Sequence, residues 1–566
     1  MSAEGGLKVV LCWHMHQPQY RNLISGDYRL PWTYLHAIKD YVDMAGHLEA
    51  VPAARAVVNF APVLLDQIRD YAGQVRGCLE RGAAIRDSVL SALADPALPA
   101  AAGERAALMH ACLRANEQNM IRRFPAYQRL AELAALFDQH PQALHYVDDQ
   151  FLVDLLVWYH LAWLGETVRR QDNRIKALME KEKEYSVHDR RELLTVIAEL
   201  LEGVLGRYAA LADRGQIELA VSPYAHPIVP LLVDLGCASE AMPDAPLPAL
   251  QHYPGGEARA RWHLHEAVVC FEHHFGRAPA GCWPSEGGVS DATLKLLDDF
   301  GFRWAASGED VLHNSLIAAG ESREQQRQHC LYHPHRVAGG NTACFFRDDR
   351  LSDRIGFVFS DWHADDAVAD LVRHLEHIAE AFEGHVVSII LDGENAWEHY
   401  PENGYYFLSA LYRSLAAHPR IELTTFSECL DQGVAIEPLP HLVAGSWVHG
   451  TFSTWIGETD KNRGWEMLGD AKRAYDAALA QGLPQDQARA AGEQLAICEG
   501  SDWFWWFGGD NPADTVSDFD QLYRMHLAHL YQLLAQEPPE YLAHAFTHGG
   551  GTPEHGGTMR HGKALA

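Results

Sequence analysis

Short apolar runs rich in β-branched and aromatic residues, separated by long helical stretches, constrain the fold of this chain more than any other feature of its sequence. Strands that stay apolar without polar alternation are typical of parallel sheets that helices cover on both faces. The runs lie at 9–13, 56–60, 217–221, 281–283, 302–306, 355–359 and 386–391. Together they predict an α/β fold with an irregular barrel. Catalytic groups of such barrels gather at the carboxyl ends of the strands, so the residues that close each run are the first candidates for chemistry.

Two helical regions accompany this pattern, one between its second and third runs and one after its last run. Residues from about 62 to 214 read as helix almost throughout, which is longer than an ordinary crossover and predicts a helical insertion packed on the barrel. After a break at 433–440, amphipathic stretches follow at 463–481, 485–498 and 516–535. The expected parts are a catalytic barrel with its insertion over 1–435, a C-terminal helical region that completes the cleft over 436–545, and a disordered tail over 546–566. The tail prediction rests on a Gly- and His-rich composition that cannot bury a core.

The negative charge of the chain excludes several classes of partner. Its 46 Lys and Arg face 76 Asp and Glu, a formal net charge of −30, which repels nucleic-acid phosphates and anionic membranes. The N-terminus has no basic segment of the kind that secretory signals carry, and no later window approaches the roughly 20 apolar residues of a spanning helix. We therefore expect a cytoplasmic protein with a neutral partner such as a sugar, and no nucleic-acid or membrane partner. The oligomeric state does not follow from the sequence.

Cysteines and histidines form no evident metal motif along the sequence. The 10 cysteines include no pair at the C-x-x-C spacing of zinc or redox sites, and most of the 33 histidines are dispersed singly. Reduced and mostly buried thiols are the expectation.

Two carboxylates follow predicted strands, each with a tryptophan close by. Glu286 closes Gly281-Cys-Trp-Pro-Ser-Glu286, and Asp392 opens Asp392-Gly-Glu-Asn-Ala-Trp397. Retaining cleavage of a glycosidic bond requires one carboxylate that attacks the anomeric carbon and one acid that protonates the leaving oxygen. Taken singly, a Glu after a strand is more often a helix cap or a solvated residue, and Asp-Gly is commonly a turn. The same arrangement on two strands favours a catalytic pair beside sugar-stacking tryptophans.

Histidines close the first and third predicted strands. His14 and His16 stand two residues apart, which places both side chains on one face of a strand, and His226 follows the run at 217–221. Such histidines serve as metal ligands, as hydrogen-bonding groups of a sugar site, or as satisfied core residues. The residue pattern leaves all three alternatives open.

Several motifs, taken in order, resemble the successive signature regions of glycoside hydrolase family 57. The first four are His16-Gln-Pro18, Gly215-Gln-Ile-Glu-Leu219 with His226 downstream, Trp283-Pro-Ser-Glu286 and Asp392-Gly-Glu394. The later segments 346–357, 455–463 and 499–506 resemble the α-amylase and amylopullulanase branch. The resemblance runs from about residue 7 to 540.

This resemblance implies an incomplete (β/α)7 barrel, a retaining mechanism and α-glucan substrates (starch, glycogen or maltodextrins) with α-1,4 and some α-1,6 linkages. It implies Glu286 as nucleophile and Asp392 as general acid/base, with no metal and no cofactor. The matched motifs also supply the substrate-binding candidates His14, His16, Gln17, His226, Trp283, Arg347, Asp353, Glu394, Trp397 and Asp502. The Trp-Pro-Ser-Glu-Gly-Gly form differs from the glucanotransferase and branching-enzyme branches, so bond preference does not follow from it.

The aromatic segment Asp502-Trp-Phe-Trp-Trp506 has two interpretations. Consecutive aromatics at a helix end usually complete a core, yet one helix turn cannot bury all four rings on one face. We therefore expect Trp503, beside Asp502, to face the cleft as a platform for a sugar ring.

The expected reaction is a double displacement. Ionised Glu286 attacks the anomeric carbon while protonated Asp392 donates its proton to the leaving oxygen. The charge on Glu286 raises the pKa of Asp392 and keeps that acid protonated. The alternatives are a 4-α-glucanotransferase or glycogen branching enzyme of the same family, a metal-dependent deacetylase or zinc mannosidase on a related barrel, and a catalytically inactive glycogen-binding protein.

Overall fold

One curled, mostly parallel sheet forms the centre of the protein. The computed structural model describes residues 6–320, 324–382, 384–551 and 558–560. Within these ranges ten strands follow the order β10-β6-β7-β5-β4-β3-β2-β1-β8, with β9 paired to β1. All pairs are parallel except β6 with β7. The strands are β1 (Leu7–Met15), β2 (Ala56–Phe60), β3 (Ile217–Val221), β4 (Gly281–Cys282), β5 (Trp304–Ser307), β6 (His335–Val337), β7 (Ala343–Phe346), β8 (Val386–Asp392), β9 (Ile421–Leu423) and β10 (Glu437–Leu439).

The two sides of this sheet approach each other. Arg347, directly after β7, forms a parallel bridge to Ser388 of β8, and the next backbone N–H, of Asp348, donates to the Ser388 carbonyl at 2.8 Å. β1 is buried along its whole length apart from one half-buried residue, as expected for a central strand with apolar side chains on both faces. The predicted α/β class is confirmed, and the sheet curls into a partial barrel.

One predicted strand is wrong. The run at 355–359 lies instead in a π-helical turn (Arg354–Val358) that continues helix α16 (Asp349–Asp353), followed by a 3-10 turn (Phe359–Asp361). Ile355 and Phe359 are buried whereas Val358 is exposed. A spacing of four places residues on one face of a helix and also on one face of a strand, so the apolar run did not distinguish the two. The sheet contains four strands that were not predicted, β6, β7, β9 and β10, each of three or four residues.

The predicted insertion consists of helices, and local residues explain where its first helix begins and ends and where its last helix begins. Helix α3 begins with Pro62 in its first turn and ends at Gly82, whose φ of 68° suits a helix C-terminus. Helix α10 begins with a capping box between Ser186 and Asp189. Helices α1 (Trp32–His36) and α2 (Val42–Ala50) precede the insertion. Its helices are α3 (Pro62–Arg81), α4 (Ser88–Ala94), α5 (Ala102–Ala111), α6 (Pro125–Gln139), α7 (Asp149–Ala162), α8 (Glu166–Gln171), α9 (Asn173–Lys181) and α10 (Val187–Asp213).

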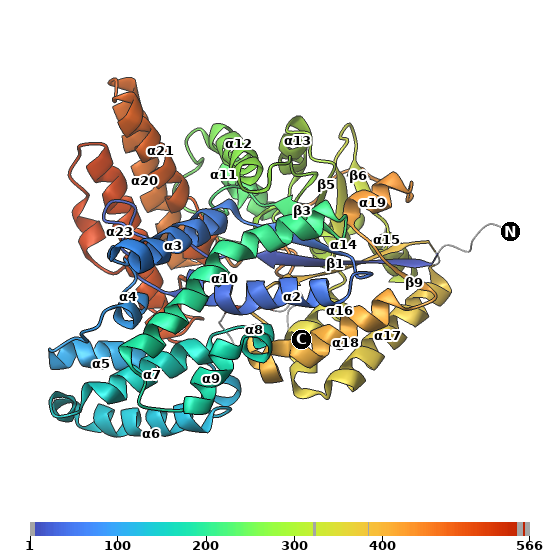
Figure 1. Cartoon of the computed structure of the whole chain (residues 1–566). Helices are drawn as coiled ribbons and strands as arrows, with labels where there is room; N and C mark the ends of the chain where they lie inside the picture. The colour runs from blue at the N-terminus through green and yellow to red at the C-terminus, as the bar shows by residue number, and fades with distance from the viewer. Residues whose placement is uncertain (1–5, 321–323, 383, 552–557, 561–566) are drawn as a thin grey trace.

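The C-terminal helices are α20 (Thr459–Ala480), α21 (Gln485–Cys498), α22 (Ser501–Trp506) and α23 (Ala513–Leu533), close to the predicted ranges. In Figure 1 these orange and red helices lie at the same end of the sheet as α4 to α7 of the insertion, but on the opposite side of the sheet. The arrow of β1 points toward that end. The carboxyl ends of the parallel strands therefore open between the two helical groups.

The start of the predicted disordered tail is docked. The ring of Phe546 packs edge-on against Phe507, and the Thr547 hydroxyl accepts a hydrogen bond from the Gly508 backbone N–H at 2.9 Å. An apolar ring and a buried hydroxyl give this part of the tail contacts that its composition did not indicate. Residues 552–557 and 561–566 of that prediction lie outside the described residues.

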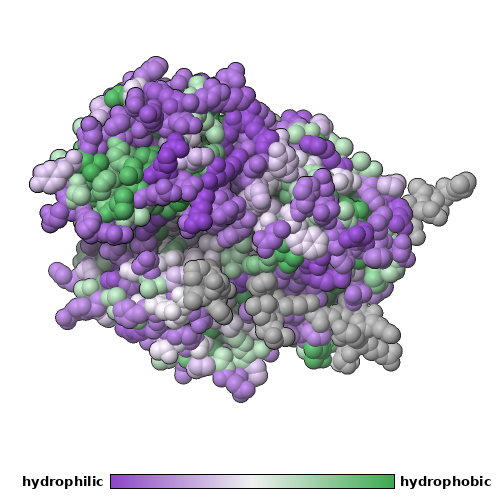
Figure 2. Space-filling model, turned by 90° about the horizontal axis from the view of Figure 1, so that it is seen from below, coloured by the Kyte–Doolittle hydropathy of each residue, from purple (hydrophilic) through white to green (hydrophobic). Residues whose placement is uncertain are grey.

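The remaining helices cover the sheet. They are α11 (Val229–Val233), α12 (Gly256–Phe275), α13 (Asp291–Asp299), α14 (Glu309–Ala318), α15 (Glu324–Leu331), α17 (Ala364–Ala381), α18 (Tyr405–Ala416) and α19 (Phe426–Asp431). In Figure 1, α11 to α13 lie on one side of the sheet and α17 and α18 on the other. The face in Figure 2 is mostly hydrophilic, with apolar side chains gathered at one end. A search of the described helices found none long and apolar enough to cross a membrane.

Candidate active site

The two predicted catalytic carboxylates line one cavity of about 670 Å3. Asp392 is the last residue of β8, and Glu286 lies in the 3-10 turn (Ser285–Gly287) that follows the short strand β4. Both positions are carboxyl ends of parallel strands, where catalytic groups of barrel enzymes gather. The structure thus brings together two residues that stand 106 positions apart (392 − 286) in the sequence.

The backbone of Glu286 is held in an unusual conformation. Its φ of 58° and ψ of 26° are left-handed, which costs roughly 1–2 kcal/mol for a residue with a Cβ. Trp447 stabilises this turn twice: its backbone N–H donates to the Glu286 carbonyl at 3.0 Å, and its indole Nε1–H donates to Glu286 Oε2 at 2.9 Å. The sequence analysis missed Trp447, which lies in the loop between β10 and α20. A lone tryptophan in Gly445-Ser-Trp447 was the one available signal.

Burial and mutual charge decide where the pair carries its proton. Burial and the charge of Asp392 raise the pKa of Glu286 to about 8, although the indole hydrogen bond lowers it. Burial raises the pKa of Asp392 to about 6, against a hydrogen bond from Asn395 and nearby positive charge. Between these values the pair therefore keeps one proton, mainly on Glu286. The sequence analysis expected it on Asp392; the order is reversed because burial and the charge of Asp392 raise the pKa of Glu286 further, whereas Asn395, which donates to Asp392 Oδ2 at 2.9 Å, stabilises the ionised Asp392.

A hydrogen-bonded chain runs beneath the two carboxylates. His14 Nδ1–H donates to Asn59 Oδ1 at 2.6 Å, because the amide oxygen can only accept. His14 Nε2 therefore accepts from His226 Nε2–H at 3.1 Å, and His226 Nδ1 accepts from the Ser501 hydroxyl at 2.9 Å. His226 has a left-handed φ of 60°, and its carbonyl accepts the Ser501 backbone N–H at 2.9 Å. Each nitrogen of both rings is thereby used.

The two histidines of this hydrogen-bonded chain, His14 and His226, are neutral. Burial and the neighbouring His16 lower the pKa of His14 to about 3. Burial lowers the pKa of His226 well below its usual range, with smaller contributions from His16 and His14. The three rings stack in parallel, with His16 and His226 centroids 3.8 Å apart and planes inclined by 19°. His14 and His16 share one face, as predicted, and His226 Nδ1 lies 3.8 Å from Glu286 Oε1.

Further polar groups face the cavity. His16 Nε2–H donates to Asp502 Oδ1 at 2.8 Å, and Gln17 Nε2–H donates to Glu394 Oε1 at 3.3 Å. Burial, with the charge of Asp392, raises the pKa of Glu394 well above its usual range. Its Oε2 has no hydrogen-bond partner among the described residues. All four side chains line the cavity and offer donors and acceptors to a polar ligand.

The cavity walls come from three parts of the chain. The insertion supplies Arg114, Asn116 and Trp163, and the C-terminal helices supply Trp505, Trp506 and Phe519. Together with the loops at the strand ends, they surround the carboxylates with both apolar rings and polar groups. A site of this kind binds a ligand with apolar faces and a polar rim, which is the chemistry of a sugar ring.

Comparison with protein families gives one match. The sequence matches the model of the family Glycosyl hydrolase family 57 over residues 10–437, which is most of the chain. The chain belongs to glycosyl hydrolase family 57. A comparison with curated proteins found no match.

Solved structures similar to this family 57 chain share its fold at low sequence identity. The GH57-type branching enzyme of Pyrococcus horikoshii is 14% identical with a TM-score of 0.54, covering 94% of this chain and 98% of that one. The α-amylase AmyC of Thermotoga maritima is 13% identical with a TM-score of 0.55, covering 94% and 93%. The 4-α-glucanotransferase of Thermococcus litoralis is 13% identical with a TM-score of 0.50, covering 93% and 60%.

The tryptophan predictions in this family 57 chain need correction. Trp503 is 1% exposed; its Nε1–H donates to the Ile497 carbonyl at 2.7 Å and its ring packs beside Tyr523. Trp505 and Trp506 line the cavity instead. The phase of α22 turns its first tryptophan into the core and its last two toward the cleft, and a six-residue helix carries too little pattern to fix that phase.

Trp283 and Trp397 also lie behind the cavity rather than on its surface. Trp283 is fully buried, with its ring 5.2 Å from that of Trp447 and 6.1 Å from that of His14. Trp397 Nε1–H donates to the Gly393 carbonyl at 2.9 Å and its ring packs against Trp13. They support the residues that line the site.

Arg347 and Asp353 form an ion pair one layer below the cavity. Arg347 donates to Asp353 at 2.7 Å, to Asp349 at 2.6 Å and to the Ile390 carbonyl at 2.8 Å. Its guanidinium lies 5.5 Å from the centre of the Trp447 ring. Neither residue of the pair lines the cavity, so both position Trp447 and β8 rather than contact a ligand there.

Proposed function

We propose that this family 57 chain cleaves and transfers α-glucans by a retaining double displacement, with Glu286 as nucleophile and Asp392 as general acid/base. The observation that carries the proposal is the convergence of these two carboxylates, from the ends of β4 and β8, on one cavity with aromatic walls. Retention requires their carboxyl groups about 5–5.5 Å apart, and a gap of about 9 Å would indicate inversion instead. A crystal structure with a bound maltodextrin measures this distance.

The residues around the pair have separate roles in this mechanism. Trp447 donates its indole N–H to Glu286 Oε2 and stabilises the ionised nucleophile. Asp392 gives its proton to the leaving oxygen and takes it back from the incoming hydroxyl. The pair holds its proton mainly on Glu286, so the reaction runs through the less populated form, in which Asp392 carries the proton and Glu286 is ionised. Activity then requires one proton on the pair, which predicts a bell-shaped pH dependence.

Substrate binding draws on polar side chains at the cavity surface. His16, Gln17 and Glu394 line the cavity and offer donors and acceptors to a ligand. His14 and His226 spend their ring nitrogens on the hydrogen-bonded chain and support the site from beneath. Trp506 and Phe519, stacked at 5.1 Å, offer an apolar wall to a sugar face. A chain of α-1,4-linked glucose, with α-1,6 branches, fits this combination of aromatic platforms and polar groups.

Transfer is the second candidate activity. The similar structures carry the names of a branching enzyme, an α-amylase and a 4-α-glucanotransferase, so an acceptor sugar is an alternative to water. Walls from both helical regions help to hold an acceptor sugar in the cavity. Incubation with maltoheptaose and with glycogen, followed by product sizing and linkage analysis, separates these outcomes: hydrolysis gives net reducing ends, transfer gives longer chains, and branching gives new α-1,6 linkages.

Two rival functions have distinct outcomes in the same assay. An inactive glycogen-binding protein shows no turnover of either substrate, and its glycogen affinity is unchanged in Glu286→Gln. A zinc deacetylase or mannosidase using His14, His16 or His226 loses all activity in EDTA and regains it only with zinc. We expect turnover that persists in EDTA, because His14 and His226 spend their nitrogens on hydrogen bonds.

We further propose the wider organisation expected from the sequence. The barrel with its insertion spans 1–435 as an incomplete (β/α)7 unit, and the helical region 436–545 completes the cleft. A cytoplasmic location is part of the same proposal, and cell fractionation with an antibody to the chain tests it.

A further inference from the structure

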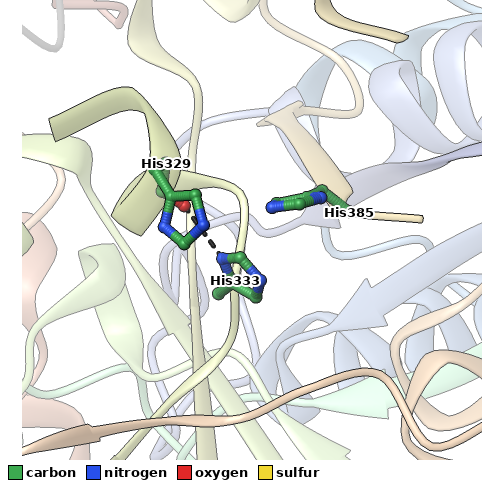
Figure 3. Close-up of side chains that lie close together, drawn as sticks. All are labelled: His329, His333 and His385. Atoms are coloured by element: carbon green, nitrogen blue, oxygen red, sulfur yellow. Dashed lines mark hydrogen bonds between the residues drawn. The ribbon is translucent and has the colours of Figure 1, made fainter. Parts of the chain in front are cut away.

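Three histidines converge at the opposite end of the barrel from the carboxylates. His329 lies in the last turn of α15, His333 follows two residues after the end of that helix, and His385 directly precedes β8. One nitrogen or more from each ring lies within 4.8 Å of the others. Figure 3 shows the three side chains reaching one region from a helix, from the loop after it and from the start of a strand.

The rings are turned steeply against one another. The planes of His333 and His385 are inclined by 66° with centroids 4.1 Å apart, and those of His329 and His385 by 77° at 5.2 Å. The lone pair of an imidazole nitrogen lies in the plane of its ring, so rings in different planes can direct their lone pairs to one point. This is the arrangement that a tetrahedral metal ion requires.

One of the rings is already fixed in a ligating form. His333 Nδ1–H donates to the His329 carbonyl at 2.9 Å, the dashed contact in Figure 3. A carbonyl only accepts, so the proton is on Nδ1 and the lone pair is on Nε2. Metal-binding histidines typically donate their other ring N–H to a backbone carbonyl in this way. The spacing of four between His329 and His333 is also one that zinc sites use.

We infer that His329, His333 and His385 form a binding site for a divalent transition metal, with zinc as the first choice. Three neutral imidazoles suit zinc, and water completes its tetrahedron. His385 stands seven positions before Asp392 along β8, which is a span of roughly 23 Å. The bound ion therefore ties α15 to the start of β8, away from the cavity with the carboxylates, and stabilises the fold without entering the reaction.

Two other groups of potential ligands are weaker. His16, His226 and Asp502 lie close enough, but the two rings are stacked in parallel and His226 spends both nitrogens on His14 and Ser501.

Asp66, Cys270 and His274 form the other group. Burial raises the pKa of Cys270 above its usual range, and its thiol lies 3.6 Å from Asp66 Oδ1 as a donor. A metal site needs the thiolate, which this environment disfavours. Of these three groups, the histidine trio is the one that combines inclined rings with a ring nitrogen of His333 left for a ligand.

The test uses the full chain stripped with EDTA and then titrated with Zn2+. The measurements are bound zinc by elemental analysis and the unfolding midpoint with and without zinc. The variants are His329→Ala and His385→Ala, with His265→Ala on α12 as the matched control, because its side chain is 65% exposed and outside the three groups. Because His329 is exposed, its replacement leaves the core intact even if His385→Ala folds poorly.

The expected result is that the parent chain and His265→Ala bind about one zinc more per chain than either trio variant. Zinc should raise the unfolding midpoint of the first two proteins, and the trio variants should lose that shift. Cobalt in place of zinc should give a tetrahedral spectrum without thiolate charge-transfer absorption. Equal zinc content in His329→Ala and the parent would overturn the proposal, as would a thiolate band, which would assign the metal to a site with a cysteine ligand, such as Asp66, Cys270 and His274.

Discussion

Two groups of three histidines occupy opposite ends of the same barrel, and their geometry differs in the orientation of the rings. His14, His16 and His226 stack in parallel, with planes inclined by 17–19°. In the group of His329, His333 and His385, the planes are inclined by 40–77°. The residue type and number are equal, so orientation and hydrogen bonding decide what each group can do.

The partners of the rings explain this difference. In the stacked group, Asn59 and Ser501 terminate a chain that uses every nitrogen of His14 and His226. In the inclined group, a backbone carbonyl uses one nitrogen of His333 and leaves the other for a ligand. The first group therefore supports the carboxylates through hydrogen bonds, and the second is arranged for an ion. The predictions below test this division, beginning with the carboxylates that the stacked group supports.

The largest effects are expected at the carboxylates. Glu286→Gln removes the attacking group and should abolish turnover of every substrate. Asp392→Ala keeps the nucleophile, so it should lose about 10²–10⁴-fold on α-glucans, whose leaving oxygen needs an acid. A fluoride or nitrophenyl glycoside needs no acid and should still load Glu286. Rates with both substrate types measure this contrast.

Azide provides the control for these roles. In Asp392→Ala the trapped glycosyl-enzyme lacks its base, and azide needs no deprotonation, so it should restore turnover and give the α-glycosyl azide. Two inversions at one carbon produce that configuration. Rescue of Glu286→Gln alone, with a β-azide as product, would mean that the two roles are reversed.

The second effect contrasts the two histidine groups directly. His226→Asn keeps a residue that tolerates a left-handed backbone but breaks the chain to His14. We expect kcat/KM to fall about fivefold to a hundredfold, since leaving the buried Nε2 of His14 without its partner costs about 1–3 kcal/mol. His329→Ala should leave kcat/KM unchanged. Equal losses in both variants would contradict the division between a catalytic and a structural group.

The sequence predicted those parts of the site that depend on local pattern. Glu286, Asp392, His14 and His16 each close a strand, and the end of a strand can be read from its own residues. The α/β class and the long helices follow from apolar periodicity in the same way. Family membership then agreed with the resemblance of the same motifs.

Features that depend on distant contacts could not be predicted. Trp447 reaches Glu286 from 161 positions away, and His385 meets His329 only because the start of β8 lies beside the end of α15. The strand predicted at 355–359 failed because its apolar residues fit a helical spacing of four as well as a strand. Which of the two carboxylates holds the proton depends on burial and on Asn395, and the spacing of residues along the sequence does not reveal either.

The third effect compares two tryptophans of α22. Trp506 lines the cavity, so Trp506→Ala should raise KM for maltoheptaose about three- to tenfold, as expected for an aromatic contact of about 0.5–1.5 kcal/mol. Trp503→Phe should leave KM unchanged and lower the free energy of unfolding by about 1 kcal/mol, because it loses one buried hydrogen bond. Steady-state kinetics and denaturant unfolding measure both. A higher KM for Trp503→Phe alone would restore Trp503 as the sugar platform.

The smallest effect is a shift of the pH profile. The profile of kcat/KM should have limbs near the pKa values of about 6 for Asp392 and about 8 for Glu286. Because the indole hydrogen bond lowers the pKa of Glu286, Trp447→Phe should raise it and move the upper limb to higher pH by about one unit or less. The productive arrangement, with Glu286 ionised, then becomes rarer, so the plateau should fall by a similar factor.

Asn395→Ala is the matched variant for the lower limb. Its amide lowers the pKa of Asp392, so its loss raises that pKa and moves the lower limb to higher pH, while the upper limb stays in place. The plateau should rise or hold, because the proton moves toward Asp392, where the reaction needs it. Since the two substitutions act on different members of the pair, their effects on the limbs should be separate. A shift of the upper limb to lower pH in Trp447→Phe would show that the indole stabilises the protonated carboxyl, and the assignment of Glu286 as an ionised nucleophile supported by Trp447 would then fail.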